Sequence, residues 1–184
     1  MSSVTIFSEK GRIWGEPKYI GPLLSDIRKQ AETADATRTL DDSLIAAIKK
    51  NDVMRLSASP EISGINETLV NIGNELRAVS GECTSTAWCL WNHLCTFHHF
   101  AGLLGKDNID LLAELTARRE WVCFPAGAAT KVNGSKNGEN SVELNGGASF
   151  GSGARYAEWA GVVFNDNSTK SPQFAFADLR LTGV

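Results

Sequence analysis

The spacing of apolar residues changes near Glu120, and this change constrains the fold more than any other feature of the chain. Before Glu120 the apolar residues recur at helical spacing, whereas after it they fall in short alternating runs. Turn-forming pairs such as Asn137-Gly138 separate these runs. We therefore predict an α+β chain, with a helical domain over residues 1–119 and an antiparallel, barrel-like β domain over residues 120–184.

Periodicity and capping residues place the individual elements. Helices are expected over Ile20–Thr33, from Thr39 or Asp41 to Lys50, from Asn66 to Val79, from Cys83 to Gly105 and from Asn108 to Leu115. Short strands are expected at Trp121–Phe124, Ala128–Val132, Val142–Leu144, Ser149–Phe150, Trp159–Phe164 and Gln173–Ala177. The pairs Asn133-Gly134 and Gly146-Gly147 are typical of turns between strands.

Composition excludes several functional classes. The 18 Lys and Arg residues nearly balance the 21 Asp and Glu residues, so no basic surface for nucleic acid is expected. The N-terminal residues mix charged with apolar side chains, unlike a signal peptide. No apolar run is long enough to span a membrane. We expect a cytoplasmic protein that binds neither nucleic acid nor membrane.

The segment Cys83–Phe100 is apolar on nearly every side, as a buried helix is. A Thr/Ser cluster at its start is suited to capping the helix. His93 lies in the middle, and is either a hydrogen-bonded core residue or part of an active-site wall. The three cysteines of the segment are six residues apart and do not share one helical face, so no metal site is predicted.

A glycine-rich segment, Gly146–Gly153, follows in the β domain. It lacks the third glycine of the dinucleotide-binding fingerprint, and no Gly-Lys-Ser/Thr follows it as in a phosphate-binding loop. One interpretation is a turn or bulge whose residues need positive φ angles. The other is a place where the backbone approaches a flat ligand, with Phe150 supplying a ring face and Ser152 a hydroxyl.

Three motifs, taken in order, resemble the acyl-CoA dehydrogenase superfamily and, more closely, its two-component flavin-dependent monooxygenase branch. The stretch Ser85-Thr86-Ala87-Trp88 with His93 is similar to the central helix of the family's N-terminal domain. Phe124-Pro125-Ala126-Gly127-Ala128-Ala129 is similar to its first middle-domain loop. The run from Leu144 to Gly153, followed by Tyr156-Ala157-Glu158-Trp159, is similar to its flavin-edge segment.

The resemblance implies an N-terminal helical domain, a middle β-barrel and a C-terminal four-helix bundle. It also implies that FMN or FAD, supplied in reduced form by a separate flavin reductase, reacts with O₂ to hydroxylate an aromatic or polycyclic substrate. The flavin would be lined by Trp88, Phe124, Phe150, Ser152 and Gly153. His93 and Phe97 would face the substrate, and His93 and Ser152 would act in catalysis by hydrogen-bonding the peroxide or the substrate.

The chain also departs from the family pattern. Ala148 stands where the family usually has Trp, and the first loop lacks the Gly-Ser-Asp of the dehydrogenases, which favours the monooxygenase branch. The chain stops at Val184, so the C-terminal bundle is expected to be absent. Two alternatives therefore stay open: an acyl-CoA dehydrogenase-like subunit acting with a partner chain, and a non-catalytic binding or assembly subunit. An oligomer is expected, formed either with further copies or with a chain that carries the bundle.

Overall fold

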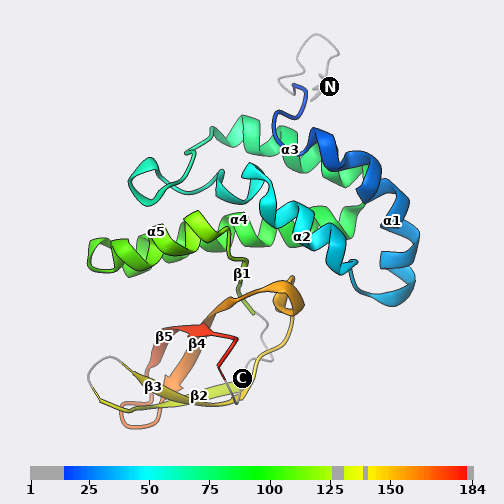
Figure 1. The fold of residues 1–184 in the computed structure, drawn as a ribbon. Helices are drawn as coiled ribbons and strands as arrows, with labels where there is room; N and C mark the ends of the chain where they lie inside the picture. Colours follow the sequence, from blue (N-terminus) through cyan, green and yellow to red (C-terminus); the bar gives the residue numbers. More distant parts are fainter. Residues whose placement is uncertain (1–14, 126–130, 139–140, 182–184) are drawn as a thin grey trace, which may run out of the picture.

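The computed structural model describes residues 15–125, 131–138 and 141–181. Its helices form one body above a five-stranded sheet, and the chain crosses from the helices to the sheet near Trp121 (Figure 1). The predicted α+β class is confirmed. None of the helices in this described part of the chain has the length and hydropathy needed to cross a bilayer.

Five α-helices make up the first part of the chain. They are α1 (Leu24–Thr37), α2 (Asp42–Lys50), α3 (Leu69–Glu82), α4 (Thr84–Leu104) and α5 (Ile109–Arg118). The 3-10 turn Gly21–Leu23 leads directly into α1, and further 3-10 turns, among them Asp52–Arg55 and Pro60–Ile62, lie between the helices.

The observed caps confirm one prediction and correct two. Asp41 caps α2 as expected, because its side chain accepts a hydrogen bond from the amide of Ser43. Helix α3 is capped by Thr68, not by Asn66, which lies outside the helix with a φ of 55°. Helix α4 has Cys83 as its N-cap, and no side chain there makes a capping hydrogen bond. A Thr/Ser cluster caps a helix only when one of its hydroxyls occupies the N-cap position.

The sheet is mixed and open, not antiparallel and barrel-like. It contains β1 (Val122–Cys123), β2 (Lys131–Lys136), β3 (Val142–Gly147), β4 (Trp159–Asp166) and β5 (Pro172–Asp178). Strand β5 pairs antiparallel with β4 along its length, whereas β1 and β2 both run parallel to β4. Because β5 pairs with one edge of β4, both β1 and β2 pair with its other edge, β1 at the start of β4 and β2 at its end. Strand β3 runs back antiparallel to β2, and the chain then leaves the sheet through the 3-10 turn Ala154–Tyr156 before it returns as β4, parallel to β2.

Two expected turns lie inside strands instead. Gly134 falls in β2, where a Cβ atom would stand 2.3 Å from the ring of Phe164. Gly146 falls in β3 with a φ of 136°, and a Cβ there would stand 2.0 Å from the carbonyl oxygen of Lys131. Close approach across the sheet, not chain reversal, therefore explains both glycines.

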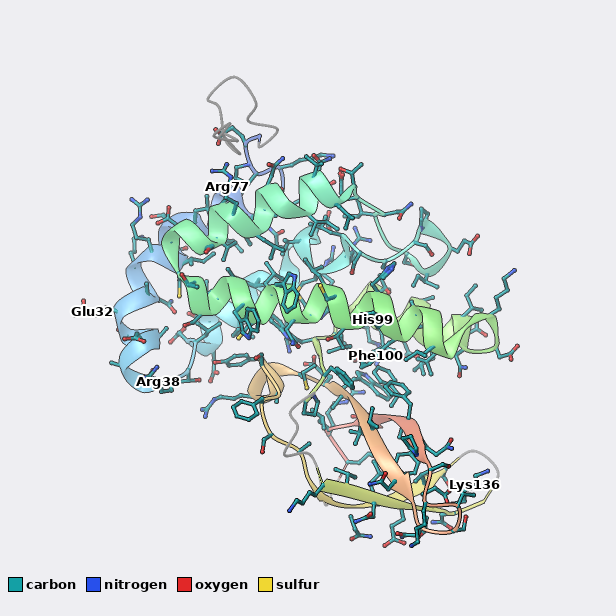
Figure 2. All side chains as sticks on the ribbon, turned by 180° about the vertical axis from the view of Figure 1, so that it is seen from behind. Glu32, Arg38, Arg77, His99, Phe100 and Lys136 are labelled. Carbon is teal, nitrogen blue, oxygen red and sulfur yellow. The ribbon has the colours of Figure 1, made fainter. Side chains whose placement is uncertain are left out.

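Helix α4 connects the two halves of the molecule through packing. Leu90 and Leu94 belong to the core cluster shared by the helices. Phe97 and Phe100, one and two turns further on, belong to a second cluster that includes Val122 and, at its margin, Phe174 and Phe176 of β5. Figure 2 shows Phe100 on α4, where it faces the sheet.

Gly161 of β4 makes this close contact possible. A Cβ at position 161 would stand 2.0 Å from the Phe100 ring and 3.0 Å from that of Phe174. We expect Gly161→Ala to lower the free energy of unfolding by roughly 1–3 kcal/mol, the usual cost of overpacking a core. Gly147→Ala is the matched control, because a Cβ there meets no atom within 4 Å. Urea denaturation of both variants measures the difference, and equal stabilities would contradict the packing argument.

Candidate active site

Trp88 and the glycine-rich segment meet at the surface of α4. Trp88 is 55% exposed, and its indole Nε1 donates a hydrogen bond to Ser152 Oγ over 2.8 Å. Trp91, one turn further along α4, stacks on Trp88 with 4.9 Å between ring centroids. Two of the residues predicted to line a flavin are thus in direct contact, although 64 positions separate them in the sequence.

The segment around Ser152 is sharply bent. Phe150 has a φ of 62°, and its side chain is 81% exposed. The amide of Ser152 donates to the carbonyl oxygen of Phe150, 3.1 Å away. A bulky residue at positive φ is strained, and a large exposed ring loses the benefit of burial. Such a residue is typical of a ligand-facing position.

Gly153 allows this segment to pack directly on the core. Its φ is 81°, and a Cβ would stand 2.8 Å from Nε1 of Trp121, so only glycine fits. Trp121 itself is fully buried and lies between the rings of His93 and Tyr156, with centroids at 5.4 and 6.2 Å. The predicted residue Gly153 therefore acts through its backbone, because it lets the turn lie directly on Trp121.

His93 is buried beneath this surface, with 1% of its area exposed. Its Nε2 lies 3.0 Å from the carbonyl oxygen of Met54, and its Nδ1 accepts the amide of Val122 over 3.1 Å. Both ring nitrogens are thus used within the protein, in the neutral tautomer that carries its proton on Nε2. Burial lowers the pKa of His93 to about 4, with the nearby charge of Lys49 as a smaller cause. This geometry matches the alternative of a hydrogen-bonded core histidine.

Phe97 and Phe124 lie on the sheet side of α4, away from the Trp88 surface. Phe97 is 4% exposed, and Phe124 packs with it in the second core cluster, where its ring meets that of Phe100 edge-on. Neither faces the Trp88–Ser152 contact. Residues 126–129 of the predicted first loop lie outside the described residues.

Three of the cysteines, Cys89, Cys95 and Cys123, are held as thiols at neutral pH. Burial raises the pKa of Cys123 to about 11 and also raises the pKa values of Cys89 and Cys95. Within residues 15–125, 131–138 and 141–181, no group of three or more metal-ligating side chains lies close enough to hold an ion.

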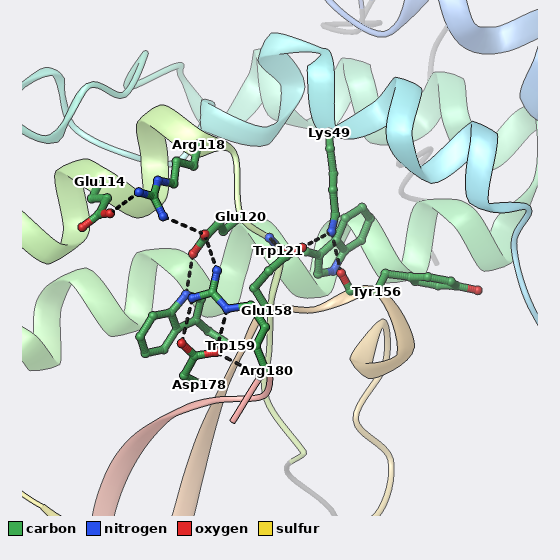
Figure 3. Close-up of polar contacts among 10 residues, drawn as sticks. All are labelled: Lys49, Glu114, Arg118, Glu120, Trp121, Tyr156, Glu158, Trp159, Asp178 and Arg180. Atoms are coloured by element: carbon green, nitrogen blue, oxygen red, sulfur yellow. Dashed lines mark hydrogen bonds and ion pairs between the residues drawn. The ribbon is translucent and has the colours of Figure 1, made fainter. Parts of the chain in front are cut away.

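Sequence reasoning missed two residues that hold the segment in place. Lys49 belongs to no sequence motif, and Glu158 occurs only within the flavin-edge motif. In the structure they form an ion pair between α2 and the start of β4 (Figure 3). No local pattern reveals such a pair, because 109 positions separate the two residues.

Sequence comparison relates the chain to a component of a hydroxylase. The chain is 29% identical over 148 residues to the oxygenase component of p-hydroxyphenylacetate 3-hydroxylase from Acinetobacter baumannii. This alignment covers 79% of the chain and 33% of that protein. The predicted resemblance is confirmed. No protein-family model matches the sequence.

Solved structures show the same fold. XiaF from Streptomyces sp., solved with FADH2 and glycerol, superimposes with a TM-score of 0.74 at 16% identity, over 88% of this chain and 40% of its own. Dibenzothiophene monooxygenase TdsC from Paenibacillus sp. A11-2 gives a TM-score of 0.76 at 15% identity, over 88% and 43%. The chain therefore spans about a third of the length of its sequence relative and about two fifths of these structures.

The burial of His93 predicts a pH-dependent stability. Its pKa is about 4 when folded and near 6.5 when unfolded, so folding favours the neutral form. Above pH 6.5 both states are neutral and His93 adds no pH dependence. As the pH falls from 6.5 to 4, only the unfolded chain takes up the proton, and stability falls by up to about 3 kcal/mol.

Urea unfolding between pH 7 and 4 measures this loss. His93→Gln should remove the slope that His93 causes between pH 6.5 and 5, above the range in which carboxylates take up protons, while lowering stability at pH 7. His99→Gln, at an exposed position, is the control for the loss of an imidazole. The same slope in wild type and His93→Gln would show that other groups cause the pH dependence.

Proposed function

We propose that this chain is the flavin-binding N-terminal part of a monooxygenase that hydroxylates an aromatic or polycyclic substrate. The observation that carries the proposal is the Trp88–Ser152 hydrogen bond, which joins two of the three motifs of the resemblance at one surface. FMN and FADH2 are bound in neighbours of the same fold, TdsC and XiaF. The sequence relative is named as an oxygenase component, which supports a separate flavin reductase as partner.

The residues at this surface fit a flat, polar-edged ring. Phe150 and Trp88 present exposed aromatic area that such a ring would cover. Ser152 already accepts from Trp88, so its hydroxyl proton is free to be donated toward a bound molecule. Ser152 lies between Gly151 and the buried Gly153, which lets the turn pack on Trp121. When bound, reduced flavin supplies the electrons that activate O₂.

The predicted roles of the site residues are supported unequally. Ser152 lies at the surface and can position a ligand by hydrogen bonding. His93 lies on the buried side of α4 with both ring nitrogens hydrogen-bonded. We therefore propose that it positions β1 against α4, and its catalytic role stays a prediction. Phe97 and Phe124 pack in the second core cluster on the sheet side of α4, so their predicted contacts with substrate and flavin also stay predictions.

We further propose that the chain is cytoplasmic and works as part of an oligomer or with a bundle-bearing chain. A groove of about 540 Å³ lies between α3 and α4 and is lined by apolar side chains, among them Leu69, Ile72, Leu76 and Trp91. Leu69 is 85% exposed. Apolar area of this kind is typical of surfaces that pack against another chain or domain.

Anaerobic titration with reduced FMN and reduced FAD tests the flavin site. Trp88 and Trp91 serve as fluorescence probes, and quenching that saturates is the expected result. Ser152→Ala should weaken binding by roughly five-fold, the worth of one hydrogen bond of about 1 kcal/mol. Ser168→Ala, on the distant turn after β4, is the matched control. The absence of binding by the wild type, alone and with a bundle-bearing relative, would refute the proposal.

A second assay separates catalysis from binding alone. With a flavin reductase, NADH and O₂, a hydroxylated product is expected from p-hydroxyphenylacetate, which the sequence relative is named for, or from indole, which is bound in a structure of TdsC. Saturable flavin binding without any product, in the presence of a bundle-bearing chain, would favour the non-catalytic alternative.

A further inference from the structure

Lys49 reaches from the last turn of α2 to the residues that follow the glycine-rich segment. Its ammonium group donates to the carbonyl oxygen of Tyr156 over 2.7 Å and pairs with the carboxylate of Glu158. The side chains of Lys49 and Glu158 are only 24% and 25% exposed. Half-buried, hydrogen-bonded ion pairs are held more rigidly than pairs in full contact with water.

Glu158 extends this contact into the centre of the molecule (Figure 3). One carboxylate oxygen of Glu158 accepts a hydrogen bond from the ammonium group of Lys49, and the other accepts one from the backbone amide of Trp121 over 2.7 Å. The amide of Glu158 in turn donates to the carbonyl oxygen of Trp121 over 2.9 Å. We call Lys49, Glu158 and these bonds the Lys49 clamp. The clamp joins α2, the crossing into the sheet and the start of β4.

The clamp lies at one end of residues 150–158, and the residues proposed to face the flavin lie at the other end. The 3-10 turn Ala154–Tyr156 lies between Gly153 and the clamp, and its amides are bonded within the turn and the preceding glycine loop. The hydroxyl of Tyr156 accepts the amide of Leu40, which attaches the turn to the loop before α2 as well. A shift of the Tyr156 carbonyl would therefore move Gly153 and Ser152 with it.

We propose that Lys49 is a positioning residue: by holding Tyr156 and Glu158, it sets where Ser152 and Phe150 stand relative to Trp88. The inference rests on the proposed flavin site. Lys49 makes no contact with those residues itself and acts through the turn. Its charge is needed because a single ammonium donates to a neutral carbonyl and a carboxylate at once, which no apolar side chain of similar length does.

Hydrogen exchange and flavin titration of Lys49→Met test the proposal. We expect the amides of residues 154–157 to exchange roughly five-fold faster and the dissociation constant for reduced flavin to rise roughly five-fold, because the turn loses about 1 kcal/mol of stabilisation. Exchange along the middle of α4 should stay unchanged. Lys49→Arg keeps the charge and should recover part of both effects.

Two controls separate positioning from general stability. Lys50→Met removes the neighbouring, exposed charge and should change neither readout. Gly161→Ala lowers stability at the sheet–α4 contact and should leave both the exchange of residues 154–157 and flavin affinity near wild type. Unchanged exchange in Lys49→Met would overturn the proposal. So would faster exchange with unaltered flavin affinity. Failure of the wild type to bind any flavin refutes the flavin site itself, a result that the titration shows separately from the exchange data.

Discussion

The rest of the structure depends on two successive backbone amides, those of Trp121 and Val122, at the junction where the chain crosses from the helices to the sheet. The Trp121 amide is bound by the carboxylate of Glu158, at the start of β4, and the Val122 amide by the imidazole of His93, in the middle of α4. A buried amide without an acceptor costs about 1–3 kcal/mol, so each bond restricts where the chain can cross. Together these two hydrogen bonds fix the position of the sheet relative to α4.

The position of the glycine-rich segment depends on this junction. Trp121 is fully buried and forms the floor on which Gly153 rests, and Lys49 and Tyr156 attach the following turn to the helices. The exposed residues of the segment are thus held in place by the packing on Trp121 and by the hydrogen bonds of Lys49 and Tyr156. This explains how Phe150 keeps a strained backbone conformation and how Ser152 meets Trp88 at hydrogen-bonding distance.

Sequence periodicity predicted the five described α-helices and four of the five described strands, because both periods are local properties of the chain. The strand predicted at Ser149–Phe150 is wrong, because these residues lie in the bent segment after β3. It misjudged Gly134 and Gly146 as turns, since a glycine needed for close approach to another strand has the same local appearance as a turn glycine. It also predicted antiparallel pairing throughout. Strand order and direction depend on long-range contacts, and β1 and β2 run parallel to β4.

For the candidate site, the sequence by itself determined the helix-to-sheet division, the residues of the flavin-edge motif and the family they resemble. Only the tertiary structure decided how these residues are used. It brought Ser152 to Trp88, turned His93 inward onto Met54 and Val122, and paired Lys49 with Glu158. The physical reason is that hydrogen-bond partners far apart in sequence leave no local pattern, since they are selected by packing, which brings one acceptor to each buried donor.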